Sequence, residues 1–305
     1  MSAITDRLLE MIASPIAAMK GAFNIREDSG CAARHSTENI RIESKTDKPG
    51  IDIRIAPGTK GEAVFIPAVV THGNLKDVAY NDFFIGEGAD VTITAGCGVH
   101  SVDGGTAQHD GIHRFFVGKN ARVLYLEKHV GTGEGSGARI INPTTEIAIA
   151  EGGCLEMDTA QIRGVDSTVR VTRGTVEGGG RLVIREKIMT HGVQRAETDF
   201  SVDLNGADSG ADLVSRSVAR DRSFQLFKMV INGNARCAGH SACDAIIMDE
   251  GVVSAIPELT ARNVDAALIH EAAIGKIAGD QLIKLMTLGL SEAEAEERIV
   301  EGFLR

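Results

Sequence analysis

Tryptophan is absent from this 305-residue sequence, and tyrosine occurs only twice. Proteins that bind single-stranded nucleic acid commonly stack the bases on aromatic side chains, so this class of partner is not expected. The formal net charge of −10 also argues against a nucleic-acid groove or an anionic membrane surface as the binding partner. Runs of about 18 or more apolar residues are missing too, which predicts that no helix spans a membrane.

The cysteines are few, odd in number and far apart in the sequence, at Cys31, Cys97, Cys154, Cys237 and Cys243. This spacing is not that of a disulfide framework. The N-terminal residues lack a basic segment followed by an apolar one, so a signal peptide is not expected. Both observations favour a reducing, cytoplasmic location.

Glycine is abundant, at 35 residues, and valine and isoleucine recur in short alternating patterns typical of an all-β body with tight turns. One phrase repeats: an apolar residue, a turn, a small residue and an alternating strand, at 85–93, 117–125, 149–157 and 176–184. Repeats of this length predict stacked coils, each of which buries its open face on the next. Glycine or asparagine at the fourth position suits a corner with positive φ. A β-sandwich is the alternative fold.

Helical spacing is confined to the two ends of the chain. Residues 4–20 predict a short amphipathic helix with Ser2 or Thr5 as its N-cap. Near the C-terminus, Gly279 and Asp280 open one predicted helix, and a Ser291-x-x-Glu294 capping box opens another. We therefore expect an N-terminal helical arm at 1–25, a core of β coils at 26–255 and a C-terminal helical module at 256–305.

The candidate site lies in the apolar run Ile269–Ile277, where His270 and Glu271 stand side by side. Burying a carboxylate beside an imidazole requires compensation, such as a metal ion or a hydrogen bond. Cys243 lies 27 residues before His270, and the three side chains together form a ligand set suited to iron or zinc. The same residues also fit a small buried thiol and a hydrogen-bonded polar pair.

Secondary metal candidates are Cys237 and His240, which form Cys-x2-His-x2-Cys with Cys243. The spacing is not that of a zinc ribbon or knuckle. If this segment is a strand, the two cysteines share one face and the imidazole takes the other. His109 and His113 would also share a strand face, and there we expect a polar exterior of a coil rather than a metal site.

The C-terminal motifs carry a family resemblance. They are His270-Glu271-Ala272-x-x-Gly275-Lys276-Ile277, Asp280-Gln281-Leu282, Leu288-Gly289-Leu290-Ser291-Glu292 and Ile299-Val300-Glu301-Gly302-Phe303. In this order they resemble the signature of the SufB/SufD family of the Suf machinery, which assembles iron–sulfur clusters. The resemblance is dense over residues 233–305. It implies a right-handed parallel β-helix, which agrees with the predicted coils.

The resemblance also implies a function. SufB-like members carry a cysteine and a glutamate at these places and are implicated in holding a nascent cluster at a subunit interface, whereas SufD-like members keep only the histidine. With all three residues present, the chain is expected to be a short SufB-like scaffold, not an enzyme, that holds a transient Fe–S cluster on Cys243, Glu271 and His270.

The partners that the resemblance implies are a SufC-type ABC ATPase, docked on the C-terminal helices, and a second copy of the chain or a SufB/SufD paralogue. The chain itself lacks the Gly-x4-Gly-Lys-Ser/Thr motif of an ATPase. Two alternatives stay open: a SufD-like structural subunit that binds the ATPase without a cluster, and a β-helix carbohydrate-active enzyme.

Overall fold

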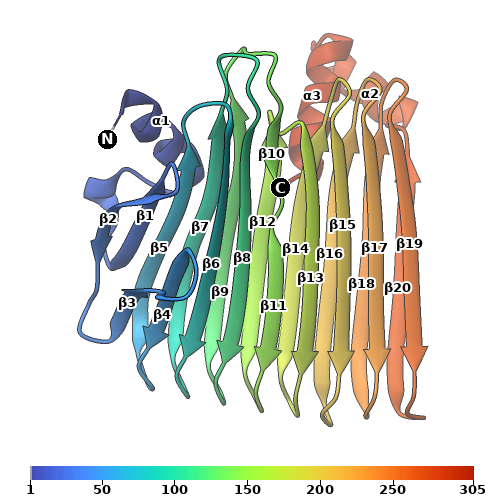
Figure 1. Cartoon of the computed structure of the whole chain (residues 1–305). Helices are drawn as coiled ribbons and strands as arrows, with labels where there is room; N and C mark the ends of the chain where they lie inside the picture. Colours follow the sequence, from blue (N-terminus) through green and yellow to red (C-terminus); the bar gives the residue numbers. More distant parts are fainter. Residues whose placement is uncertain (1) are drawn as a thin grey trace.

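The computed structural model describes residues 2–305 and shows a parallel β-solenoid, as predicted (Figure 1). From β4 onward each coil adds one strand to each of two facing sheets, except that β10 and β11 together occupy one place in their sheet. Within the described residues the helices are α1 (Ala3–Ile12), the 3-10 helix η1 (Ile16–Ala18), α2 (Gly279–Met286) and α3 (Glu292–Phe303).

Sheet A runs in the order β2-β1-β5-β7-β9-β12-β14-β16-β18-β20, with only the first pair antiparallel. Its strands are β1 (Ala22–Glu27), β2 (Gly30–His35), β5 (Lys60–Val70), β7 (Asp90–His100), β9 (Arg122–Thr132), β12 (Cys154–Arg163), β14 (Arg181–Thr190), β16 (Ser209–Ala219), β18 (Cys237–Ile247) and β20 (Ala266–Gly275).

Sheet B runs in the order β19-β17-β15-β13-β10-β8-β6-β4-β3, with β11 also placed between β13 and β8. Its strands are β3 (Ile40–Ser44), β4 (Gly50–Ile55), β6 (Leu75–Ile85), β8 (Ala107–Val117), β10 (Arg139–Ile141), β11 (Thr144–Ile149), β13 (Ser167–Val176), β15 (Arg195–Leu204), β17 (Phe224–Gly233) and β19 (Val252–Ala261).

The repeated phrase of the sequence is confirmed as the corner between a strand of sheet B and the next strand of sheet A. The fourth residue of each copy has positive φ, as expected: Gly88 (66°), Asn120 (54°), Gly152 (67°) and Gly179 (65°). Only glycine, and at small cost asparagine, adopts this conformation readily, so these residues fix where each coil turns.

The N-terminal helix is shorter than predicted. Ser2 caps α1 through a bond from the Thr5 backbone N–H, but the helix ends at Ile12 rather than at residue 20. Pro15 explains the early end, because proline fixes its own φ and disfavours helix in the residue before it. The helix packs on the outside of sheet A, where Gly96 allows close approach; a Cβ there would lie 2.7 Å from Ile12 Cβ.

The predicted boundary at residue 255 is wrong, since it falls inside β19. The coils continue through β20 to Gly275, and the helices begin only at Gly279. Segment 266–275 pairs in register with β18 over its whole length, and such pairing between distant segments leaves no local sign in the sequence.

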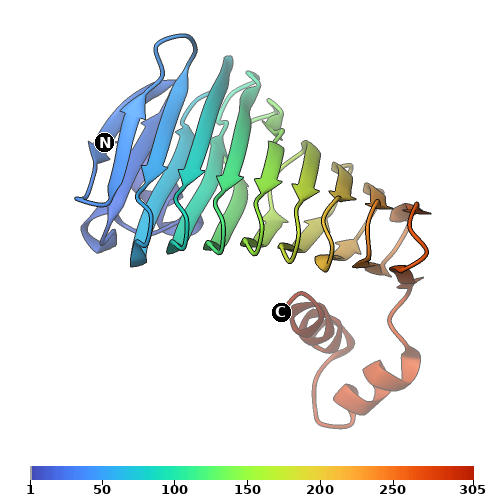
Figure 2. The ribbon, with the colours of Figure 1, turned by 90° about the horizontal axis from the view of Figure 1, so that it is seen from below.

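The C-terminal helices stand beside the C-terminal half of the solenoid rather than across its last coil (Figure 2). The capping box of Ser291 and Glu294 is confirmed at the start of α3. Val300 of α3 and Leu304, which directly follows the helix, pack on Val218 and Ile246 of sheet A, so α3 is anchored on the β body.

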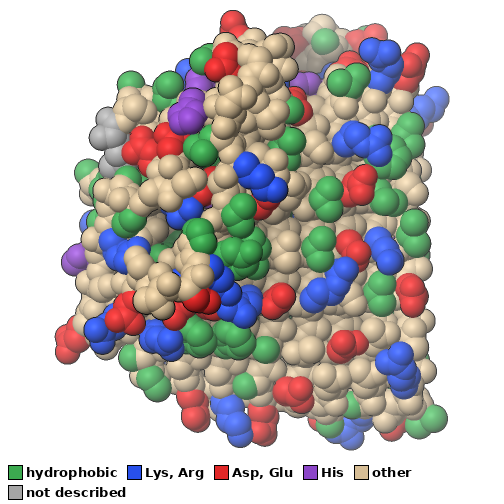
Figure 3. Space-filling view, in the orientation of Figure 1, with side chains coloured by type: hydrophobic (Ala, Val, Ile, Leu, Met, Phe, Trp, Pro, Cys, Tyr) green, Lys and Arg blue, Asp and Glu red, His purple; other side chains and the backbone are tan. Residues whose placement is uncertain are grey.

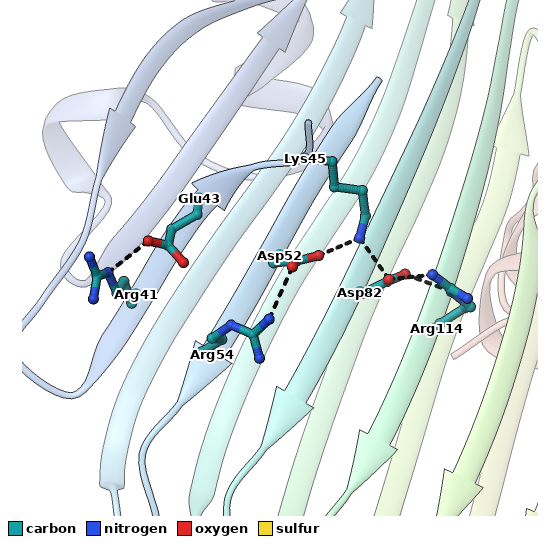
Figure 4. Close-up of polar contacts among 7 residues, drawn as sticks. All are labelled: Arg41, Glu43, Lys45, Asp52, Arg54, Asp82 and Arg114. Atoms are coloured by element: carbon teal, nitrogen blue, oxygen red, sulfur yellow. Dashed lines mark hydrogen bonds and ion pairs between the residues drawn. The ribbon is translucent and has the colours of Figure 1, made fainter. Parts of the chain in front are cut away.

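On the N-terminal part of sheet B, a buried ionic cluster ties the end of β3 to its neighbours (Figure 4). Lys45 Nζ lies 2.7 Å from Asp82 Oδ2 and also contacts Asp52, and Arg114 Nε donates to Asp82 Oδ1 at 2.7 Å. Burial works against the charge of Lys45, but the two carboxylates hold the pKa of Lys45 above its ordinary value. Elsewhere, charges of both signs are interspersed over the face seen in Figure 3.

Replacing Asp82 by Asn should lower the free energy of unfolding by about 2 kcal/mol, since charge-assisted hydrogen bonds to a buried carboxylate are lost. Guanidinium unfolding monitored by circular dichroism measures this. The exposed pair of Asp199 with Arg173 is the matched control, and Asp199→Asn should cost less than about 1 kcal/mol. Equal losses for the two variants would contradict a structural role for the Lys45 cluster.

Candidate functional site

Cys243 lies inside the solenoid, one strand away from the end of sheet A. It is 1% exposed and packs against Ile188, Ala196 and Phe227. In the ladder it lies beside Ser215 on one side and Ala272 of the last strand on the other. Burial, with the charges of Glu186 and Asp244, raises the pKa of the Cys243 thiol to about 12. The thiol is therefore protonated at neutral pH, and metal binding there must release a proton.

His270 and Glu271 project from opposite faces of β20, because side chains alternate along a strand. His270 lies beside the inward-facing Ser241, and its Nδ1 is 2.7 Å from Ser241 Oγ. Glu271 lies beside Ala242 and is largely exposed on the outer face. The structure therefore brings Cys243 and His270 to the same side of the last strands but places the carboxylate of Glu271 on the other side.

On the outer face, Glu271 meets His240 instead. His240 Nε2 is 3.7 Å from Glu271 Oε2, and His240 Nδ1 is 2.8 Å from Asp212 Oδ1. As expected, His240 faces away from Cys237 and Cys243. The two cysteines are six residues apart on one strand, so about 20 Å separates them and they cannot hold one ion together.

The last coil is open. Strands β19 and β20 each pair with a single neighbour within the described residues, and their exposed large apolar side chains are Val252, Ile256, Ile269 and Ile274. Unpaired backbone groups and apolar side chains at a sheet edge favour pairing with another chain. In residues 2–305, no group of three or more His, Cys, Asp or Glu side chains is arranged to hold a metal ion.

Residues 75–303 match the family model described as SUF system FeS cluster assembly, SufBD core domain. An iron-sulfur cluster assembly SufBD family protein of Archaeoglobus fulgidus is 30% identical over 268 residues, which covers 88% of this chain and 71% of that protein. A family member from Methanocaldococcus jannaschii is 28% identical over 292 residues, covering 93% and 90%. One from Methanothermobacter thermautotrophicus is 27% identical over 268 residues, covering 86% and 64%.

The chain belongs to the SufBD family. It is an iron–sulfur cluster assembly protein of that family, and the match includes every strand from β6 to β20 together with α2 and α3. The SufBD core thus contains Cys243, His270 and Glu271 as well as the open coil. Among residues 2–305, none of the helices combines the length and apolar character needed to cross a membrane.

This SufBD chain also has a buried ionic row inside its coils that sequence reasoning missed. Arg170 Nη1 donates to Glu127 Oε2 at 2.8 Å, and Arg170 Nε lies 3.3 Å from Glu186 Oε1. Glu186 accepts hydrogen bonds from Ser215 and Thr198. The row therefore reaches Ser215, which is the ladder neighbour of Cys243.

Through His129, which lies 3.4 Å from Glu127, this row reaches a second buried thiol, Cys97. His109 and His129 lie beside Cys97, and although burial opposes ionisation, these two imidazoles lower the pKa of Cys97 to about 7. Against the opposing effect of burial, Cys97 and Asp77 raise the pKa of His109 to about 10. The sequence signal is a set of polar residues on one face of each strand, His109 and His113 on β8 and Tyr125, Glu127 and His129 on β9, which resembles an exposed strand face.

The interpretation of His109 and His113 as a polar exterior is wrong, because both side chains point into the solenoid and are 2% and 5% exposed. They have different partners. His109 Nδ1 is 3.0 Å from Asp77 Oδ2, and His113 Nδ1 is 2.9 Å from Tyr125 Oη. Burial lowers the pKa of His113 to about 4, so it is neutral at physiological pH.

Replacing Arg170 by Met should lower the free energy of unfolding at pH 7 by about 3–5 kcal/mol, because Glu186 then stays buried without its cation and Glu127 keeps only His129. Burial alone would raise the pKa of Glu127, but His129 and Arg170 hold it well below its ordinary value of 4.5. In the wild-type chain the ionised Glu127 stabilises the fold above pH 4.5, and this stabilisation is lost as the pH falls. Without Arg170 the buried carboxyls take up protons at a higher pH than in the wild type, so the difference between variant and wild type should shrink as the pH falls from 7 to 4.

Denaturant unfolding at pH 7 and at pH 4 measures the effect of the Arg170 substitution. Arg185→Met is the matched control, since Arg185 pairs with Glu156 at the surface, and it should change stability by less than about 1 kcal/mol. A pH-independent loss in the Arg170 variant would contradict the ionic role of the row.

Proposed function

We propose that this chain is a scaffold subunit on which an iron–sulfur cluster is assembled at the open end of the solenoid, with Cys243 as the thiolate anchor and His270 and Glu271 as further ligands. The cluster is the cargo of the protein and is bound transiently. The observation that carries the proposal is the position of Cys243, which has only the edge strand β20 between it and the end of sheet A.

The chemistry of these residues supports transient binding. Thiolates hold iron and sulfide firmly, whereas imidazole and carboxylate oxygen are weaker ligands for such a cluster. The high pKa of Cys243 keeps the site protonated until iron displaces the proton. Because Glu271 faces outward, it can ligate a cluster only at the free edge of β20. At that edge a second chain would contact both the inner and the outer face of the strand.

The second chain in this proposal is another solenoid, either a copy of this chain or a SufB/SufD paralogue. The exposed apolar side chains of β19 and β20, with Ile256 at 49% and Ile269 at 57%, support pairing at this edge. Pairing there would shield the cluster from water.

The motor partner in this proposal is a SufC-type ABC ATPase in the cytoplasm, docked on the C-terminal helices. α3 is anchored on the β body, but α2 has no buried residue. Its Ile283 and Met286, with the following Leu288, are 60%, 42% and 75% exposed. An amphipathic helix with its apolar side uncovered suits docking into a groove of a partner.

Cys243→Ala should lose most of the iron–sulfur absorbance after anaerobic reconstitution with iron and sulfide, because the thiolate anchor is gone. Cys31→Ser is the matched control, since Cys31 is exposed at the other end of the chain, and it should reconstitute like wild type. Circular dichroism checks that both variants are folded. Unchanged absorbance in Cys243→Ala would contradict the role of Cys243 as the anchor. Failure of the wild type and of both variants to form a cluster would favour the SufD-like structural role.

Light scattering of the purified chain should give the mass of two chains. Ile269→Lys places a charge on the edge strand and should return the mass to that of one chain. Val169→Lys is the matched control, because Val169 is 43% exposed on β13, away from the open end, and this variant should stay dimeric. If the wild-type protein has the mass of one chain, the homodimer proposal is wrong.

A further inference from the structure

Three side chains line up on the outer face of the last coils of sheet A. They are Asp212 of β16, His240 of β18 and Glu271 of β20. The register places His240 directly beside Asp212, and Glu271 lies two residues beyond the ladder partner of His240. Their side chains are 43%, 37% and 72% exposed, so all three are open to ions in solution.

The hydrogen bond to Asp212 fixes the tautomer of His240. An ionised carboxylate can only accept a hydrogen bond, so the proton in the 2.8 Å contact belongs to Nδ1 of the imidazole. In the neutral ring, Nε2 then carries the free lone pair and faces Glu271. A carboxylate that orients a histidine in this way is the usual outer-shell partner of a metal-binding imidazole.

The gap between His240 and Glu271 has the size that a metal ion requires. At 3.7 Å, Nε2 and Oε2 are too far apart for a hydrogen bond. A metal ion bonded to both atoms at about 2.1 Å, with a ligand–metal–ligand angle of about 120°, would hold the two atoms about that far apart. The His240 and Glu271 side chains are both open to solvent on this face, which leaves room for water ligands.

We infer that His240 Nε2 and the Glu271 carboxylate bind a ferrous ion on the outer face, with Asp212 as the positioning residue. This inference rests on the proposed function, since iron is the cargo there. One neutral imidazole and one carboxylate, without a thiolate, form a labile site for a divalent first-row metal. Glu271 directly follows His270, which lies on the same side of the last strands as Cys243. The ion is therefore bound one residue away from a side chain on the Cys243 side.

The test is a titration of tag-free protein with Co²⁺, and anaerobically with Fe²⁺, followed by calorimetry and by the visible spectrum of cobalt. His240→Gln and Glu271→Gln should abolish the site, and Asp212→Asn should weaken binding by about 10–100-fold. The matched controls are His35→Gln and Glu250→Gln, exposed residues away from this face, and both should bind like wild type.

Cys243→Ala separates this site from the cluster site. It should bind cobalt like wild type, with no thiolate-to-cobalt charge-transfer band in either protein. Absence of cobalt binding in the wild type, or its loss in Cys243→Ala, would overturn the outer site. If cobalt binding fails while cluster reconstitution succeeds, only the outer site is wrong; if cobalt binds and no cluster forms, the scaffold role is wrong.

Discussion

The parallel, in-register stacking of sheet A is the constraint on which the rest of the structure depends. Each strand repeats the inward and outward positions of the strand before it, so one inward position continues from Glu127 through Thr159, Glu186 and Ser215 to Cys243. Positive-φ corner residues keep the coils in step, because an insertion of one residue would turn every side chain to the other face. The stacking alone decides that Cys243 faces inward and Glu271 outward.

This stacking also explains the polar interior. Most inward positions form an apolar core, but Glu127, Arg170 and Glu186 lie within it as a compensated ionic row. Ion pairs of this kind seldom add net stability over an apolar core, although breaking one is costly. The C-terminal end differs, since its last coil is neither capped nor paired in the described chain. At the N-terminal end the two sheets finish in the antiparallel strands β2 and β3, whereas β19 and β20 leave large apolar side chains exposed, which suits pairing with a second chain.

Much of the fold could be predicted from the sequence, because its signals are local. The corner phrase, the Ser291 capping box and the alternation of Ile51, Ile53 and Ile55 each depend on neighbouring residues. The site was only partly predictable. Alternation implies opposite faces for His270 and Glu271 once their segment is assigned to a strand, but that strand is defined by its pairing with β18. The contacts of Asp212 with His240, and of Cys97 with His109 and His129, join distant segments and have no local signature.

The central claim is that the open end, with Cys243 beneath its last strand, is where the cluster forms. Anomalous diffraction at the iron absorption edge, from anaerobic crystals of the reconstituted protein, locates the iron directly. The account predicts iron within bonding distance of Cys243 Sγ, at the edge of β20 and facing a second solenoid. Iron beside Cys97 or Cys31, with none near Cys243, would contradict it.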